Sequence, residues 1–375
     1  ESGDGRADGA QLVLEAMLQS PHFLYRTELG DDGAPLSGFE IAAKLSFLLR
    51  NTTPNDDLLD AAASGALDLP AGVVEMTRQL LEAPDAAQTV QRFHGELFGL
   101  DRYLSIAKDR ASFPQHDESI NPTLARAEEL FLDQLFRSGL GLEALLTSTM
   151  AYANEELAPF YGVRVSGAEL QSVELGPERP GLFTRLGFLA YNGTLRDPDS
   201  IHRGVEINRT MMCASLSPPP GMIPALPTVQ PGQTNRERVN AHTGPGTCGA
   251  GCHATIINPV GFAFENFDAM GQLRETDNGK PVDTHSEYDF GAGLVPFDGV
   301  AELMPLLAAS PRAHACYARH LAEFGLGRDI DARDKVLIDG LQRASALEGE
   351  SIKELLMTVV ASPQFMQRTP MEGTL

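Results

Sequence analysis

The stretch Thr247-Cys248-Gly249-Ala250-Gly251-Cys252-His253 determines how the rest of the chain is interpreted. It contains two of the four cysteines, and a histidine directly follows the second one. A Cys-x-x-Cys-His run is the attachment signature of c-type haem, in which both thiols bond to the haem and the histidine ligates the iron. The spacer here has three residues, an uncommon variant. We expect one covalent haem c on Cys248 and Cys252, with His253 as an iron ligand.

Two other interpretations of this stretch stay open. A small metal site could use the same cysteine and histidine side chains, with no haem. A local disulfide between Cys248 and Cys252 is sterically feasible across the two intervening glycines, and His253 would then be a surface residue.

The second axial iron ligand has two main candidates. Met270 lies 17 residues after His253, and its thioether would give a high-potential site. His242 lies six residues before Cys248, and it could instead contact a haem propionate or the backbone. An open iron position would favour peroxide or oxygen chemistry over electron transfer. Less favoured ligands are Met211, Met212 and His202.

Several further side chains suit a haem pocket. Phe262 and Phe264 could pack on the apolar face of the cofactor, although aromatic residues are equally expected in any core. Cationic side chains that could neutralise propionates, or else form ordinary ion pairs, are Arg203, Arg274 and Arg328.

Composition limits the partners. The chain of 375 residues has 51 acidic and 29 basic side chains, a net charge of −22, which opposes binding to nucleic acid or to anionic membranes. It suits an exported protein, or one that meets a basic redox partner protein or a small oxidant. No apolar run approaches the roughly 20 residues of a membrane span. A homo-oligomer or larger assembly is compatible with the sequence.

The other two cysteines, Cys213 and Cys316, are the only thiols left once haem uses the first pair. Haem attachment and lasting disulfides both point outside the cytoplasm, so we expect a periplasmic or extracellular protein in which these two residues pair. Their bridge would clamp the proline-rich stretch Ser217–Pro231 against the C-terminal helices. Two buried free thiols are the alternative.

The fold class expected from periodicity is mainly α, with several consecutive helical units, a loop-rich cytochrome-c-like module and few short strands. The segments are 1–35 (N-terminal helix), 36–165 (helical domain), 178–290 (proline-rich strap and module) and 298–372 (C-terminal helical domain). Ser37 with Glu40 predicts a capping box, and Asp277-Asn278-Gly279 predicts a turn. Helices are expected over 9–26, from 38, from 54, and over 70–81, 86–98, 122–136, 201–213, 313–324 and 352–361.

The order of several motifs resembles a large family of secreted bacterial proteins made of consecutive domains of unknown function, the planctomycete-type cytochrome C family. The resemblance covers nearly the whole chain, and residues 242–271 are its most specific part. It implies a c-type cytochrome-like module but no substrate. This chain departs from the family in its longer cysteine spacer and its lack of tryptophan. The matching motifs are Ser20-Pro21-His22-Phe23-Leu24-Tyr25-Arg26 with Glu28, Ala43-Lys44-Leu45-Ser46-Phe47-Leu48-Leu49, Tyr152-Ala153-Asn154-Glu155-Glu156-Leu157-Ala158 with Tyr161-Gly162, His202-Arg203-Gly204, Met212-Cys213, Asn258-Pro259-Val260-Gly261-Phe262-Ala263-Phe264-Glu265-Asn266-Phe267-Asp268 with Gly271, Cys316, Gly327-Arg328 and Ser362-Pro363-Gln364-Phe365.

Two hypotheses follow from the sequence. The first is an exported c-type cytochrome-like protein with a single haem, acting in electron transfer or a peroxidase-like step; as an enzyme it would be a haem-dependent oxidoreductase. The second is a secreted structural or binding protein, such as a subunit of an extracellular assembly, whose Cys/His loop is a disulfide or metal staple. A visible absorption spectrum separates the two.

Overall fold

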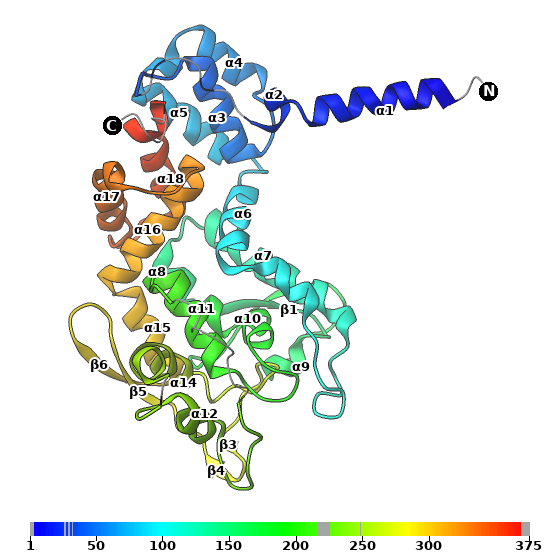
Figure 1. The fold of residues 1–375 in the computed structure, drawn as a ribbon, viewed down its shortest axis with the longest axis vertical. Helices are drawn as coiled ribbons and strands as arrows, with labels where there is room; N and C mark the ends of the chain where they lie inside the picture. The colour runs from blue at the N-terminus through cyan, green and yellow to red at the C-terminus, as the bar shows by residue number, and fades with distance from the viewer. Residues whose placement is uncertain are drawn as a thin grey trace. The chain divides into compact units, whose positions relative to one another are not determined.

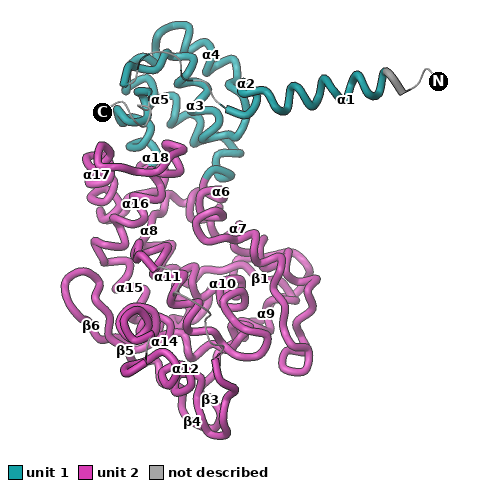
Figure 2. Tube along the Cα trace, viewed as in Figure 1, with its two compact units in different colours: residues 1–89, 356–375 teal, residues 90–355 magenta. Residues whose placement is uncertain are grey.

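The computed structural model describes residues 4–25, 28, 31, 33–216, 226–247 and 249–368. The chain divides into two compact units, Glu1–Thr89 with Leu356–Leu375 and Val90–Leu355 (Figure 2). Helices dominate both, which confirms the expected fold class (Figure 1). This division by contacts differs from the four segments expected from the sequence, which stay a prediction. Within the described residues, none of the helices has the length and apolar character needed to cross a bilayer.

The first unit is built on α3 (Gly38–Arg50), α4 (Asp56–Ala63) and α5 (Pro70–Leu81). The predicted capping box is confirmed, because the Ser37 side chain accepts from the Glu40 amide and Glu40 accepts from the Ser37 amide. The C-terminal helix α19 (Pro363–Met366) belongs to the same unit. Lys44 Nζ fixes it by donating to the Phe365 carbonyl over 3.0 Å.

The helix expected over 9–26 is instead two helices, α1 (Asp4–Leu18) and α2 (Pro21–Leu24). The interruption falls at Ser20, because the residue before a proline disfavours the helical conformation and Pro21 suits the first helical position. The apolar stripe that suggested a core helix lies on the surface: its exposed members are Leu12, Leu14, Met17, Leu18 and Phe23.

The second unit contains the remaining helices. Two of them cross the limits of the units: α6 (Ala87–Phe98) starts in the first unit, and α18 (Ile352–Val360) ends in it. The others are α7 (Asn121–Arg137), α8 (Leu142–Thr147), α9 (Ala158–Tyr161), α10 (Leu186–Tyr191), α11 (Ser200–Met212), α12 (Asn235–Thr243), α13 (Ala250–Cys252), α14 (Asn258–Phe262), α15 (Gly299–Ala308), α16 (Pro311–Leu326) and α17 (Lys335–Ser345). At the centre, α11 packs against both α14 and α16. The helices expected over 122–136, 201–213 and 313–324 are therefore confirmed to within a few residues.

Three antiparallel hairpins supply the few short strands: β1 (Met150–Ala153) with β2 (Gln171–Glu174), β3 (Thr276–Asp277) with β4 (Lys280–Pro281), and β5 (His285–Asp289) with β6 (Leu294–Asp298). The predicted turn joins β3 and β4 through Asn278 and Gly279, whose φ angles are 47° and 82°. Two consecutive residues at positive φ are the requirement of a tight hairpin turn, which Asn-Gly satisfies.

A disulfide joins Cys213, which ends α11, to Cys316 in α16, as predicted. The Cα atoms are 5.4 Å apart. Residues 217–225 of the expected strap lie outside the described residues, so the clamping of that stretch stays a prediction.

Loss of this bridge is expected to destabilise the second unit. Cys213→Ser combined with Cys316→Ser opens a loop of 103 residues and should lower the free energy of unfolding by about 4 kcal/mol, since the unfolded chain gains freedom. Urea unfolding measures the change. His285→Ala is the control, because this side chain is exposed on β5 of the same unit. Equal midpoints for the double variant and the control would contradict the stabilising role.

Candidate functional site

The Cys/His segment folds into one continuous helical run of α13, a wider π turn over His253–Ile257, and α14. In the π turn the Asn258 amide donates to the His253 carbonyl, five residues back. The turn therefore holds one residue more than an α-helical turn. Such bulges occur mostly as single turns and frequently at functional sites. The histidine of the motif thus begins a locally widened helix, which the sequence pattern did not predict.

His253 is half-buried, and its Nδ1 atom is fully buried without a hydrogen-bond partner. The Oδ1 atom of Asn258 is likewise buried without a partner, while the Nδ2 of the same amide donates to Thr243 Oγ1 over 3.0 Å. The pKa of His253 is lowered overall. Burial is the main cause and the nearby His242 adds to it, while the Asn258 side chain acts in the opposite direction. The imidazole is therefore held neutral at neutral pH, the form in which histidine binds a metal.

The glycines of the motif leave room beside the imidazole. A Cβ atom at Gly249 would lie 3.2 Å from His253 Cδ2, tighter than an ordinary contact, whereas one at Gly251 would meet nothing within 4 Å. Cys252 is an exposed free thiol adjacent to this space. Cys248 lies outside the described residues, so the relative placement of the two thiols stays a prediction.

Close packing against α11 fixes the segment. A Cβ atom on Gly204 would come within 2.2 Å of the Ile257 carbonyl, and one on Gly261 within 1.9 Å of the Ser200 carbonyl, so only glycine allows these helices to approach. Asn208 of α11 donates from Nδ2 to the Ile256 carbonyl over 3.0 Å, inside the π turn. The widened turn is therefore held by a specific bond from a neighbouring helix.

A buried carboxylate ties three elements of the site together. Glu265 is 2% exposed and accepts hydrogen bonds from Ser200 Oγ, from Asn235 Nδ2 (2.8 Å) and from Arg274 (2.8 Å). Burial raises the pKa of Glu265, while these partners lower it. Ser200 begins α11 and Asn235 begins α12, so the cluster fixes the helix that carries His242.

The arginines proposed for haem propionates all have protein partners. Arg203 is fully buried and donates to the carbonyls of Asn192, Phe264, Phe267, Leu189 and Asp268. Arg274 pairs with Glu265 and Asp277, and Arg328 pairs with Asp334. These bonds give Arg203 a structural role, and its contact with a propionate stays a prediction.

The remaining predicted ligands lie in different surroundings. Met270 is fully buried in a turn, where its amide donates to Asp268 Oδ1 over 2.8 Å. Among the described residues, no polar or ring contact joins Met270 to His253. Phe262 is buried beneath the Arg236 guanidinium, 4.5 Å from its ring centroid. Phe264 packs against Phe188, with ring centroids 6.2 Å apart.

His242 lies close enough to His253 to lower its pKa. Met270 carries no charge and so has no such effect, and both axial candidates stay predictions. Met211 and Met212 are buried in α11, and His202 pairs with Asp199 on the surface of the same helix. Sequence reasoning missed Asn258 as a neighbour of the histidine, because an asparagine before a proline is typical of a turn and carries no metal signature of its own.

Comparison with protein-family profiles gives three matches in series. Residues 36–163 match a protein family of unknown function (DUF1592), residues 179–277 match DUF1588, labelled PSCyt3, and residues 295–365 match DUF1585. The DUF1588 match contains the Cys/His motif, the π turn and the Glu265 cluster. Searches of curated proteins and of solved structures found no significant match.

Proposed function

We propose that this chain, which belongs to the multi-domain planctomycete-type cytochrome C family formed by the DUF1592, DUF1588 and DUF1585 segments, carries one covalent haem c and acts in redox chemistry outside the cytoplasm. One observation carries the proposal. His253, directly after Cys252, presents an Nδ1 atom that is buried beside the unpartnered Oδ1 of Asn258. A metal-bound histidine typically donates its other ring N–H to such an acceptor.

Each residue would have a defined part in holding the group. Cys248 and Cys252 would supply the two thioether bonds, and His253 would ligate the iron through Nε2 while its Nδ1–H donates to Asn258. Gly249 leaves the edge of the imidazole uncovered. When bound, the haem iron supplies reversible one-electron transfer, or peroxide chemistry if one axial position is open.

The surrounding helices would set the properties of the site. α11 and α14 exclude water from the back of the motif, because Ile257 and Val260 are buried between them. The second axial ligand would be His242, on α12 near His253, or the thioether of Met270. The electron partner would be a redox protein or a small oxidant.

Asn258 should influence the reduction potential of the haem iron through its contact with His253. Asn258→Asp is expected to lower the reduction potential, because a charged acceptor makes the imidazole a stronger donor and favours the oxidised iron. Thr243 now donates its hydroxyl to the Val239 carbonyl over 2.8 Å and would have to turn it toward the carboxylate to keep the contact with residue 258. Asn258→Ala should weaken ligation by about 10- to 100-fold. Spectroelectrochemical titration measures the potentials.

Thr255→Ala is the matched control, since Thr255 lies in the same π turn but its exposed side chain bonds only to the Gly251 carbonyl. The control should leave the potential unchanged. Equal potentials in wild type and Asn258→Asp would remove Asn258 from the proposed site.

A further inference from the structure

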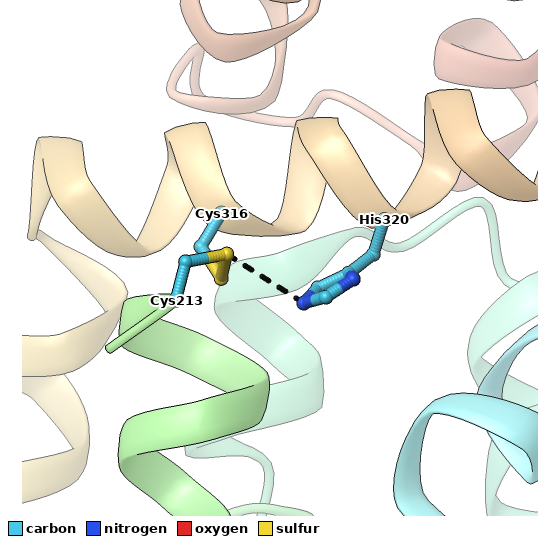
Figure 3. Close-up of side chains that lie close together, drawn as sticks. All are labelled: Cys213, Cys316 and His320. Atoms are coloured by element: carbon cyan, nitrogen blue, oxygen red, sulfur yellow. Dashed lines mark hydrogen bonds between the residues drawn. A yellow bond between two sulfur atoms is a disulfide. The ribbon is translucent and has the colours of Figure 1, made fainter. Parts of the chain in front are cut away.

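The disulfide has a histidine at its side. Cys213 Sγ lies 3.6 Å from His320 Nε2, and the two sulfur atoms and this nitrogen all lie within 4.8 Å of one another (Figure 3). Cys316 and His320 are four residues apart on α16 and so share one face of that helix. Cys213 reaches them from the C-terminus of α11.

The orientation of His320 suits a metal ligand. Its Nδ1 atom lies 3.4 Å from Glu323 Oε2, one turn further along α16. A carboxylate on one ring nitrogen leaves the other nitrogen as the ligand, and this carboxylate–histidine pair recurs around zinc. Here the other nitrogen, Nε2, is the atom that faces the sulfurs (Figure 3). Its contact with Cys213 Sγ, and the hydrogen bond of the imidazole to the Arg209 backbone, would give way to the metal.

We propose that reduction of the Cys213–Cys316 disulfide creates a zinc site formed by these two thiolates and His320 Nε2. An external dithiol gives two electrons and two protons to the bridge, so the S–S bond breaks, two thiols form and the dithiol becomes a disulfide. Zn²⁺ then displaces the two thiol protons and bonds to both sulfurs and to the imidazole. The fourth position takes water.

The distances fit this chemistry. Zinc bonds of about 2.0 Å to nitrogen and 2.3 Å to sulfur, at the tetrahedral angle, place the two ligand atoms about 3.5 Å apart. The observed separation of Cys213 Sγ and His320 Nε2 is 3.6 Å. Two sulfurs on one zinc lie about 3.8 Å apart by the same geometry. Once the bridge is open, the exposed Cys213 is the residue that turns about χ1 to separate the sulfurs, and its distance to His320 Nε2 changes with it. The 3.6 Å separation therefore shows that the imidazole is within reach of this sulfur, and the final ligand distances form when the metal binds.

An entry path leads to the cluster. A cavity of about 690 Å³ in the same unit is lined by His320 and Glu323 together with Thr210, whose carbonyl lies 3.5 Å from Cys316 Sγ. Its charged lining is mixed, with Glu96, Glu206, Glu323 and Asp329 against Arg102, Arg209 and Arg328, so the cavity supplies access to the imidazole and not a preference for cations. A hydrated ion and the fourth, water ligand both have room in this cavity.

The site would couple metal binding to redox state. Because zinc binds only the dithiol form, it stabilises the reduced protein, and oxidation of the thiols expels the ion. This inference does not rest on the haem, whose cysteines are a different pair.

The test uses the full chain carrying Cys248→Ser and Cys252→Ser, so that Cys213 and Cys316 are its only cysteines. The protein is reduced anaerobically with a phosphine reductant and titrated with Co²⁺ as a spectroscopic probe. We expect one equivalent of Co²⁺ to give a near-ultraviolet thiolate charge-transfer band and the visible bands of a tetrahedral ion, and one equivalent of Zn²⁺ to abolish them. The oxidised protein should give neither.

His320→Ala in the same background should lose the tetrahedral bands and bind Co²⁺ at least tenfold more weakly. Lys335→Ala, an exposed change on α17 whose ion pair is with Asp339, should bind like the parent. Circular dichroism and a urea-unfolding midpoint of each reduced protein establish that it keeps its helix content and a cooperative fold. Absence of the thiolate band in the folded, reduced parent, or an unchanged spectrum in His320→Ala, would overturn the proposal.

Discussion

A His253→Ala variant is expected to keep its haem attached through Cys248 and Cys252 but to lose the low-spin absorption spectrum. The thioether bonds do not involve the imidazole, so the cofactor stays on the chain. The iron loses its proximal nitrogen and becomes five-coordinate or takes a weaker ligand. Absorption and electron paramagnetic resonance spectra of the purified variant measure the change.

His285→Ala is the matched control for this experiment, because His285 is an exposed histidine on β5 and no role at the iron is assigned to it. Its spectrum should equal that of the wild type. A low-spin spectrum that survives in His253→Ala would show that another residue is the proximal ligand.

Replacing both motif cysteines, Cys248→Ser with Cys252→Ser, is expected to abolish covalent haem completely. A serine hydroxyl is a far weaker nucleophile than a thiolate and forms no thioether. Haem staining of the denatured protein after electrophoresis measures the loss. Cys213→Ser with Cys316→Ser is the control: it removes the same number of sulfurs, and the denatured chain should still stain. Staining of the first variant, or its absence in the control, would refute this assignment.

Much of the fold could be predicted from local signals. A helix start is specified by Ser37 with Glu40, and a hairpin by Asn278 with Gly279. Both depend on interactions within a few residues, so no tertiary information is needed. The Cys213–Cys316 bridge was also predictable, but by elimination among the four cysteines and not from any local pattern.

The parts that were missed depend on tertiary contacts. The π turn at His253–Ile257 is held by Asn208 of a distant helix, and periodicity alone cannot reveal such a bond. His320 has no motif of its own; only the packing of α11 on α16 brings it to the disulfide.

Arg203 shows the same limit for a charged residue. Because the sequence resembles that of a haem protein, its arginines suggest propionate binding. The Arg203 guanidinium instead donates to five backbone carbonyls in the core. A buried cation must replace its lost hydration with hydrogen bonds, and the sequence does not show which groups supply them. The apolar residues of α1 illustrate the opposite error, since a helical period does not guarantee burial.

The intact mass of the wild-type chain tests the central claim most directly. The protein should be produced in cells that mature c-type cytochromes, denatured in acid so that any non-covalent haem dissociates, and weighed by mass spectrometry. We expect the 40.4 kDa chain plus the mass of one haem. An unmodified chain from such cells would contradict it, and would favour a secreted structural or binding protein in which the Cys/His loop is only a staple.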